Sequence, residues 1–120
     1  MISNESLCIL QWNLHGFRTH RPFLQNAIDE IKPNIIALQE TLLKESDQSY
    51  LSGFNPPFRK DRDDRSGGGV AIFKANLAAI PLSIDTESEC VAVDFFPCGL
   101  RLRIINLYLP PSCSASDILI

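Results

Sequence analysis

The sequence has no apolar run that approaches the roughly 18 residues needed for a membrane-spanning helix. Its first ten residues also lack the basic start and the long apolar core of a signal peptide. Apolar residues make up 45% of the chain and charged residues 21%, which is typical of a soluble globular protein rather than a disordered one. We therefore expect a protein of the nucleus or cytoplasm that is not secreted and has no membrane partner.

Cysteine and histidine are too few and too scattered to predict a zinc site. The cysteines form no CxxC pair, and the histidines do not lie near them at a ligand spacing. The residues concerned are Cys8, Cys90, Cys98 and Cys113, with His15 and His20. We expect reduced thiols rather than disulfides. With 120 residues, the chain is one domain or a piece of one.

A basic excess is also missing, because 11 Lys and Arg residues stand against 14 Asp and Glu residues and give a net charge of -3. This balance argues against a protein that coats nucleic acid, although a nuclease can carry its basic groups in a few loops. Two small basic groups are candidates for such loops: Arg18, His20 and Arg21, and then Arg59, Lys60, Arg62 and Arg65. Phosphate contact and a simple solvated loop remain open for both groups.

Two apolar segments each end in polar residues. Leu7 to Asn13 and Asn34 to Glu40 both predict strands buried on both faces, and the residues between them predict a helix with Pro22 in its first turn. A strand, helix, strand unit makes the two strands parallel, so their carboxyl ends meet at one edge of the sheet. Asn13 and Glu40 should therefore lie close together, where open α/β sheets place their ligands.

The second half of the chain predicts antiparallel strands. A glycine-rich turn at residues 65–69 leads into a strand at Val70 to Lys74, and Pro81 marks Ala78 to Ile84 as an edge strand. Segments 89–96 and 100–109 alternate apolar and polar residues around a turn, which is typical of a hairpin. The whole chain thus predicts an α/β fold with mixed parallel and antiparallel strands.

Four segments now carry a resemblance. WNLHG at 12–16, LQET at 38–41, SGGGVAIF at 66–73 and NLYLPP at 106–111 resemble, in order and spacing, the endonuclease/exonuclease/phosphatase superfamily. Within it, the chain looks most like the apurinic-type endonuclease domain of a non-LTR retrotransposon of the jockey or RTE kind. The resemblance implies an α/β sandwich of two sheets.

The resemblance also implies roles for individual residues. Glu40 matches the metal-binding Glu of the family, Asn13 matches an Asn that helps hold metal and phosphate, and Tyr108 matches a catalytic Tyr that contacts the scissile phosphate. The implied cofactor is Mg²⁺ or Mn²⁺, and oxygen ligands suit these ions. His15 is a departure, because apurinic endonucleases often have Asp there. His15 and Arg18 are candidates for phosphate or DNA contact, although a loop histidine that hydrogen bonds within the protein is the favoured explanation of His15.

Each of these three residues also has a simpler explanation. On sequence alone, Glu40 would be an exposed residue at a strand end, Asn13 a turn former and Tyr108 a core residue. The two explanations differ in geometry. If the residues share a site, their side-chain tips should meet in one cleft within roughly 10 Å, the span of a metal with its water and a bridging phosphate. Otherwise they should scatter.

Two motifs that the family carries later in the domain do not occur, namely a GDFN segment and a closing Asp-His pair. We therefore expect residues 1–120 to be the N-terminal half of a truncated domain, inactive alone. The ancestral function would be metal-dependent DNA nicking that leaves a 3′ hydroxyl to prime reverse transcription. One alternative is an inositol polyphosphate or sphingomyelin-type phosphatase of the same superfamily, and another is a non-catalytic fragment.

Overall fold

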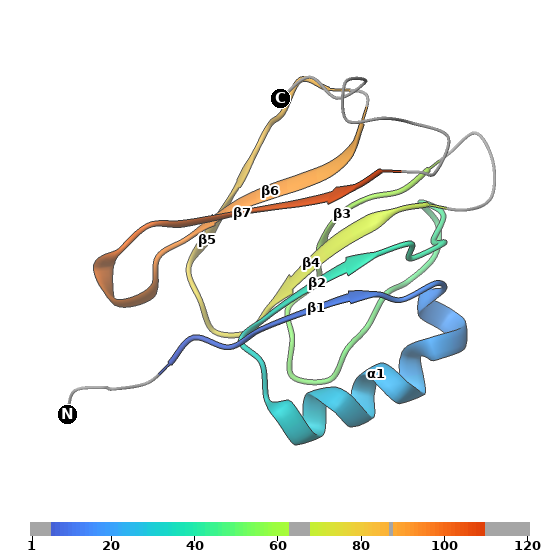
Figure 1. Cartoon of the computed structure of the whole chain (residues 1–120), viewed down its shortest axis with the longest axis horizontal. Coiled ribbons are helices and arrows are strands. Elements are labelled where there is room, and N and C mark those ends of the chain that lie inside the picture. The colour runs from blue at the N-terminus through green and yellow to red at the C-terminus, as the bar shows by residue number, and fades with distance from the viewer. Residues whose placement is uncertain (1–5, 63–67, 87, 110–120) are drawn as a thin grey trace.

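The computed structural model describes residues 6–62, 68–86 and 88–109, which fold into two sheets and one α-helix (Figure 1). The four-stranded sheet has the order β1-β2-β4-β3, and the three-stranded sheet has the order β5-β6-β7. The elements in chain order are β1 (Ile9–Asn13), α1 (Phe17–Ile31), β2 (Ile35–Gln39), β3 (Phe58–Lys60), β4 (Val70–Lys74), β5 (Ala79–Leu82), β6 (Glu89–Phe95), a 3-10 turn (Pro97–Gly99) and β7 (Leu102–Tyr108). Arg65, Cys113, Ser66, Gly67 and the last two prolines of NLYLPP lie outside the described residues.

The first three elements form the predicted parallel unit. β1 and β2 pair in parallel, and Asn13 lies opposite Gln39 at the carboxyl end of both strands. The helix begins earlier than predicted, because α1 starts at Phe17 and contains Pro22 in its interior. Gly16 precedes the helix with a φ of 116°, a conformation that favours glycine. Because Gly16 has no side chain to cap the helix, the sequence did not mark this start. The helix ends where the N–H of Lys32 donates to the carbonyl of Ile28.

The helix covers one face of the four-stranded sheet and the three-stranded sheet covers the other (Figure 1). Because successive side chains of a strand point to opposite faces, β2 contributes to both layers. Ile36 and Leu38 pack in the helix-side core, which includes Phe17, Leu24 and Phe73. Ile35 packs between the sheets with Ile72, Val93 and Phe95. The prediction that β2 is buried on both faces is confirmed.

The same prediction for the first strand is wrong. β1 lies at the edge of its sheet, and Ile9, Gln11 and Asn13 are exposed. The reason is the placement of the second sheet, whose strands β6 and β7 contact β2, β3 and β4. The inward face of β1 borders an open groove instead of packing against the second sheet.

The second half forms the predicted hairpin. β6 and β7 are antiparallel, with Glu89 opposite Tyr108 and Phe95 opposite Leu102. β5, which contains Pro81, pairs with β6 alone and forms an edge of this sheet. β3, which pairs with β4, was not predicted from the sequence. Within the described ranges, no helix has both the length and the apolar character that crossing a membrane requires.

Candidate functional site

Glu40 is the centre of a cluster of polar side chains at the carboxyl ends of β1 and β2. The hydroxyl of Tyr108 donates to Glu40 Oε2 at 2.8 Å. His15 Nδ1 lies 3.2 Å from Glu40 Oε1, and the side chain of Asn13 lies close enough to help lower the pKa of the carboxyl group. The three residues expected to share a site are therefore brought together, from two strands of one sheet and one strand of the other.

The contacts shift the ionisation of both groups. Partial burial raises the pKa of Glu40, but the hydrogen bonds from Tyr108, His15 and Asn13 and the charge of His15 outweigh it, so the pKa falls below the usual 4.5. The pKa of Tyr108 is raised above 10.0 by burial, then by its hydrogen bond to Glu40 and by the charges of Glu40 and Glu89. At neutral pH, the carboxyl group is ionised and the phenol keeps its proton.

A set of backbone hydrogen bonds holds the two loops that carry the cluster. The N–H groups of Gly16 and Phe17 donate to the carbonyls of Glu40 and Thr41, each at 2.8 Å. His15 and Glu40 have φ values of 57° and 53°, in the left-handed region that costs most side chains energy. These hydrogen bonds hold both residues in that conformation, which turns their side chains toward each other.

Asn106 fixes the second sheet over the first. Its side chain is buried, and its Nδ2 donates to the carbonyls of Leu38 and Ala71, both at 2.9 Å. Its Oδ1 accepts a hydrogen bond from Gln39 Nε2, which makes Asn106 a bridge between β7, β2 and β4. Because residues two apart point to the same face of a strand, Asn106 also directs Tyr108 toward the first sheet.

An open groove of about 630 Å³ runs between β1 and β7. Asn13 and Tyr108 line it, together with Gln11, Gln39 and Asn106. Its apolar walls include Ile9 and Ile105, which are 44% and 46% exposed. The polar cluster therefore lies beside a channel that is open to solvent.

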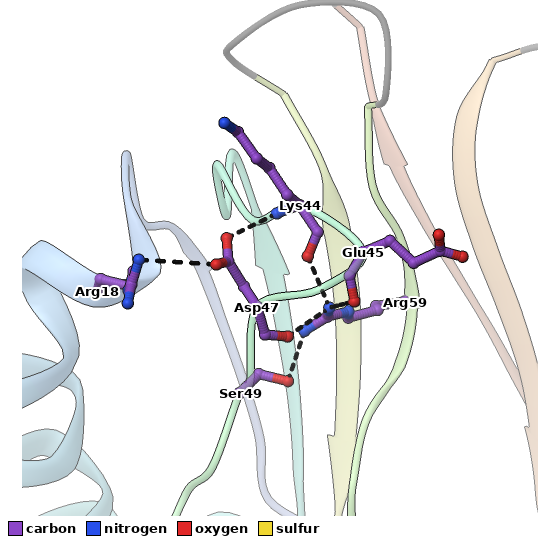
Figure 2. A network of polar contacts seen from close by, with 6 residues as sticks. All are labelled: Arg18, Lys44, Glu45, Asp47, Ser49 and Arg59. Carbon is purple, nitrogen blue, oxygen red and sulfur yellow. Dashed lines mark hydrogen bonds and ion pairs between the residues drawn. The ribbon is translucent and has the colours of Figure 1, made fainter.

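The predicted basic groups behave differently from one another. In the second group, Arg59 donates to the carbonyls of Lys44, Glu45 and Asp47 and to Ser49 Oγ, so it binds the loop at residues 44–49 (Figure 2). Lys60 donates to the carbonyls of Thr86 and Ser88, and Arg62 pairs with Glu89. These three cations bind the protein itself, which neither the solvated-loop interpretation nor the phosphate-contact interpretation predicted.

Arg18 lies in the first turn of α1 and keeps its side chain 77% exposed. Its Nη1 is 3.6 Å from Asp47 Oδ1, at the margin of the network in Figure 2. Arg21 donates to the carbonyl of Tyr50, and His20 contacts the carbonyl of Gly16. Arg18 is therefore the member of this group that remains best placed to reach a ligand, whereas its two companions contact the protein backbone.

The donor set fits a divalent cation that prefers oxygen ligands. Glu40 supplies an ionised carboxylate, and Asn13 supplies an amide on the groove wall beside it. Among the described residues, no group of three or more His, Cys, Asp or Glu side chains could hold a metal. The protein would therefore contribute few charged ligands, as is usual for Mg²⁺, which keeps several waters and takes oxygens from a bound phosphate.

No protein-family model and no curated protein matches the sequence. Solved structures do match the fold. An AP endonuclease from Leishmania major superposes with a TM-score of 0.72 at 17% identity, over 97% of this chain and 46% of that one. This is the endonuclease/exonuclease/phosphatase fold. The APE2 catalytic domain of Xenopus laevis has it too, with a TM-score of 0.64 at 23% identity, over 87% of this chain and 45% of that one.

A third structure with this fold is the 3′ phosphatase NExo from Neisseria bound to a product DNA hairpin. Its TM-score is 0.60 at 20% identity, over 86% of this chain and 41% of that one. The chain thus spans less than half the length of each of these three proteins. The expected fold class, an α/β sandwich of two sheets with mixed strands, is confirmed.

Two residues beside the site were missed by sequence reasoning. Asn106 had a usable signal, because it stands two positions before Tyr108 and must share its face of the strand. No feature of the sequence marked Glu89, because its role depends on contacts with residues that are distant in sequence. Glu89 Oε1 accepts the N–H of Gly69 at 2.6 Å, and its other oxygen pairs with Arg62.

Proposed function

We propose that this chain carries the metal-binding part of a divalent-metal-dependent phosphodiesterase site that cleaves DNA. The observation that supports the proposal most strongly is the hydrogen bond between Tyr108 and Glu40, which joins the two sheets beside the groove that Tyr108 and Asn13 line. The fold adds support, since the AP endonuclease of Leishmania major and the APE2 catalytic domain share it. The activity, the metal (Mg²⁺ or Mn²⁺) and the DNA substrate are all parts of this proposal.

In this site, Glu40 would be the charged metal ligand, and Asn13 would add a neutral oxygen that does not repel phosphate. A bound divalent cation would neutralise phosphate charge in the transition state. Tyr108, which donates to Glu40 in this structure, would turn its hydroxyl proton to a phosphate oxygen when substrate binds beside the carboxylate. Arg18, which is exposed in the first turn of α1 just after His15 and Gly16, would contact the DNA backbone.

The finer assignment is to the endonuclease of a non-LTR retrotransposon. It is supported by the residues of the SGGGVAIF and NLYLPP segments, which resemble that branch more than they resemble the inositol polyphosphate or sphingomyelin phosphatases. The NExo structure makes 3′-end processing a second candidate, since a DNA 3′ phosphatase shares the fold. The two candidates differ in product, because one cuts inside a strand and the other acts at its end.

The test uses a completed domain, in which the chain is joined to a C-terminal half of the length that its structural neighbours have. We expect metal-dependent nicking of supercoiled plasmid that EDTA abolishes. Glu40→Gln should lower the rate by orders of magnitude, because it removes the charge that anchors the metal, while DNA binding weakens far less. Asp94→Asn, which removes a carboxylate at the far end of β6, is the matched control and should nick normally.

Equal losses of rate and DNA binding in Glu40→Gln, or full activity in it, would remove Glu40 from the metal site. Labelled oligonucleotides with a 3′ phosphate or an internal abasic site then separate end processing from internal cleavage. We expect the 120-residue chain alone not to nick DNA above background, because it lacks the GDFN and Asp-His motifs. Nicking by the chain alone that EDTA abolishes would contradict that expectation.

A further inference from the structure

Glu40 depends on a turn from another part of the chain for its backbone conformation. Thr41 and Leu42, which follow it directly, donate their N–H groups to the carbonyls of Gly69 and Gly68, at 3.2 and 2.9 Å. Glu40 and Leu42 both have left-handed φ values, of 53° and 57°. Neither residue favours that conformation by itself, so the surrounding hydrogen bonds must maintain it.

Glu89 holds this glycine turn in place. One of its carboxylate oxygens accepts the N–H of Gly69 at 2.6 Å, and the other pairs with Arg62. The fit is close, since a Cβ atom on Gly68 would lie 2.3 Å from Glu89 Oε1 and 2.8 Å from the guanidinium carbon of Arg62. A side chain at position 68 would have to displace this ion pair and would also be strained at the φ of 71°, which explains one of the glycines in the SGGG segment.

Glu89 is also the residue of β6 that lies directly opposite Tyr108 of β7. Its side chain is 12% exposed, so the carboxylate is mostly removed from solvent. One carboxylate is thus placed between the two halves of the site. Its side chain binds the turn that holds the Glu40 loop, and its backbone lies opposite Tyr108 in the β6–β7 hairpin.

We propose that Glu89 is a positioning residue, which fixes Glu40 against Tyr108 through the Gly68–Gly69 turn without contacting the metal or phosphate itself. The inference rests on the proposed function only in taking Glu40 as the metal ligand. Groups that hydrogen bond directly to a metal ligand typically contribute 10- to 100-fold to metal affinity, and Glu89, which acts through the glycine turn, should contribute at the lower end of that range. The role would make Glu89 as necessary to the site as the residues that the sequence motifs contain.

The test measures amide hydrogen exchange by NMR in the 120-residue chain. In Glu89→Ala, we expect the amides of Thr41 and Leu42 to exchange at least about tenfold faster, while the core amides of Ile36 and Leu38 keep their rates. Mn²⁺ affinity should fall about tenfold. Glu89→Gln keeps an acceptor for the Gly69 N–H but loses the charge opposite Arg62, so it should restore most of the protection and most of the affinity.

Asp94→Asn is the matched control, because Asp94 is a buried carboxylate of the same strand that forms a bidentate pair with Arg103. It should leave Thr41, Leu42 and Mn²⁺ affinity unchanged. If Glu89→Ala fails to fold, Glu89→Gln tests the inference instead. The amides of Thr41 and Leu42 should then exchange about threefold faster in Glu89→Gln than in the wild type.

Exchange that changes equally at all amides, or not at all at Thr41 and Leu42, would overturn the inference. If the exchange pattern is as expected but the wild-type chain binds no Mn²⁺, the proposed function fails and the structural role of Glu89 stands. If Mn²⁺ binds through Glu40 and Glu89→Ala leaves that affinity unchanged, the proposed function stands and the positioning role fails.

Discussion

Tyr108 and Glu40 belong to different sheets and are 68 residues apart in sequence, yet their side chains meet in a hydrogen bond of 2.8 Å. Glu40 directly follows β2, and Tyr108 is the last residue of β7. The contact exists only when the two sheets pack in the correct register. The site therefore forms only when both sheets are packed together, and substitutions that loosen the packing between the sheets should also disturb the contact between Tyr108 and Glu40.

Tyr108→Phe should destabilise the fold by about 1.5 to 3 kcal/mol at neutral pH, because it removes a hydrogen bond to a charged group. The effect should depend on pH. Since the pKa of Glu40 is lowered in the folded state, the stabilisation is complete above the usual value of 4.5 and is lost as the pH falls through the folded-state value. Urea denaturation at neutral and acid pH measures this. Tyr50→Phe, at an exposed position, is the control, and an equal Tyr108→Phe effect at both pH values would contradict the prediction.

Asn106→Ala should cost about 2 to 4 kcal/mol of unfolding free energy, because it leaves the carbonyls of Leu38 and Ala71 without these hydrogen bonds in the interior. Asn55→Ala, at an exposed asparagine that contacts Lys74, should cost less than about 1 kcal/mol. Chemical denaturation of the two variants gives the comparison. Similar losses in both would show that Asn106 does not bridge the sheets.

Gly69→Ala should destabilise the chain more than Gly53→Ala does. Both glycines have positive φ values, of 96° and 87°, so both substitutions carry the same backbone cost of about 1 kcal/mol. They differ in space, since a Cβ on Gly69 would lie 2.4 Å from Thr41 Oγ1, whereas nothing lies within 4 Å at Gly53. The difference in melting temperature between the two variants isolates the contact with Thr41. Equal melting temperatures would mean that the turn can move away from Thr41 without loss of stability, which would contradict the prediction.

His15→Asp should change which metal the site prefers. His15 Nδ1 lies 3.2 Å from Glu40 Oε1, close to the roughly 3 Å that separates adjacent ligands around an ion held at about 2.1 Å. Imidazole suits Mn²⁺ and later transition metals better than Mg²⁺, so Asp should raise Mg²⁺ affinity relative to Mn²⁺. Calorimetric titration of both ions measures the ratio. His20→Asn is the control, and an unchanged ratio in His15→Asp would exclude His15 from the metal's surroundings.

Much of the fold was predictable because it depends on local pattern. The apolar segments that end at Asn13 and Gln39, with a helix between them, require parallel strands, and the structure has them. The alternation around Pro97–Gly99 required a hairpin. Within these constraints, the proximity of Asn13 and Glu40 follows from chain geometry alone.

What could not be predicted depends on which surfaces meet. The sequence of β7 does not show which of the two sheets the strand joins. The sequence of β1 does not show that one of its faces remains exposed. The internal use of Arg59 was equally hidden, because a long cation can reach either solvent or a ring of carbonyls. β3 was missed since three residues, Phe58–Lys60, are too few to show a period.

The most direct test of the metal site that Glu40 and Tyr108 would share is a Mn²⁺ titration of the 120-residue chain, followed by electron paramagnetic resonance. The wild type should bind one equivalent of Mn²⁺, and Glu40→Gln should weaken that binding at least about tenfold, because the charged carboxylate at the centre of the cluster is lost. Tyr50→Phe should bind as the wild type does. Equal Mn²⁺ affinity in the wild type and Glu40→Gln, or no binding in the wild type, would contradict the assignment.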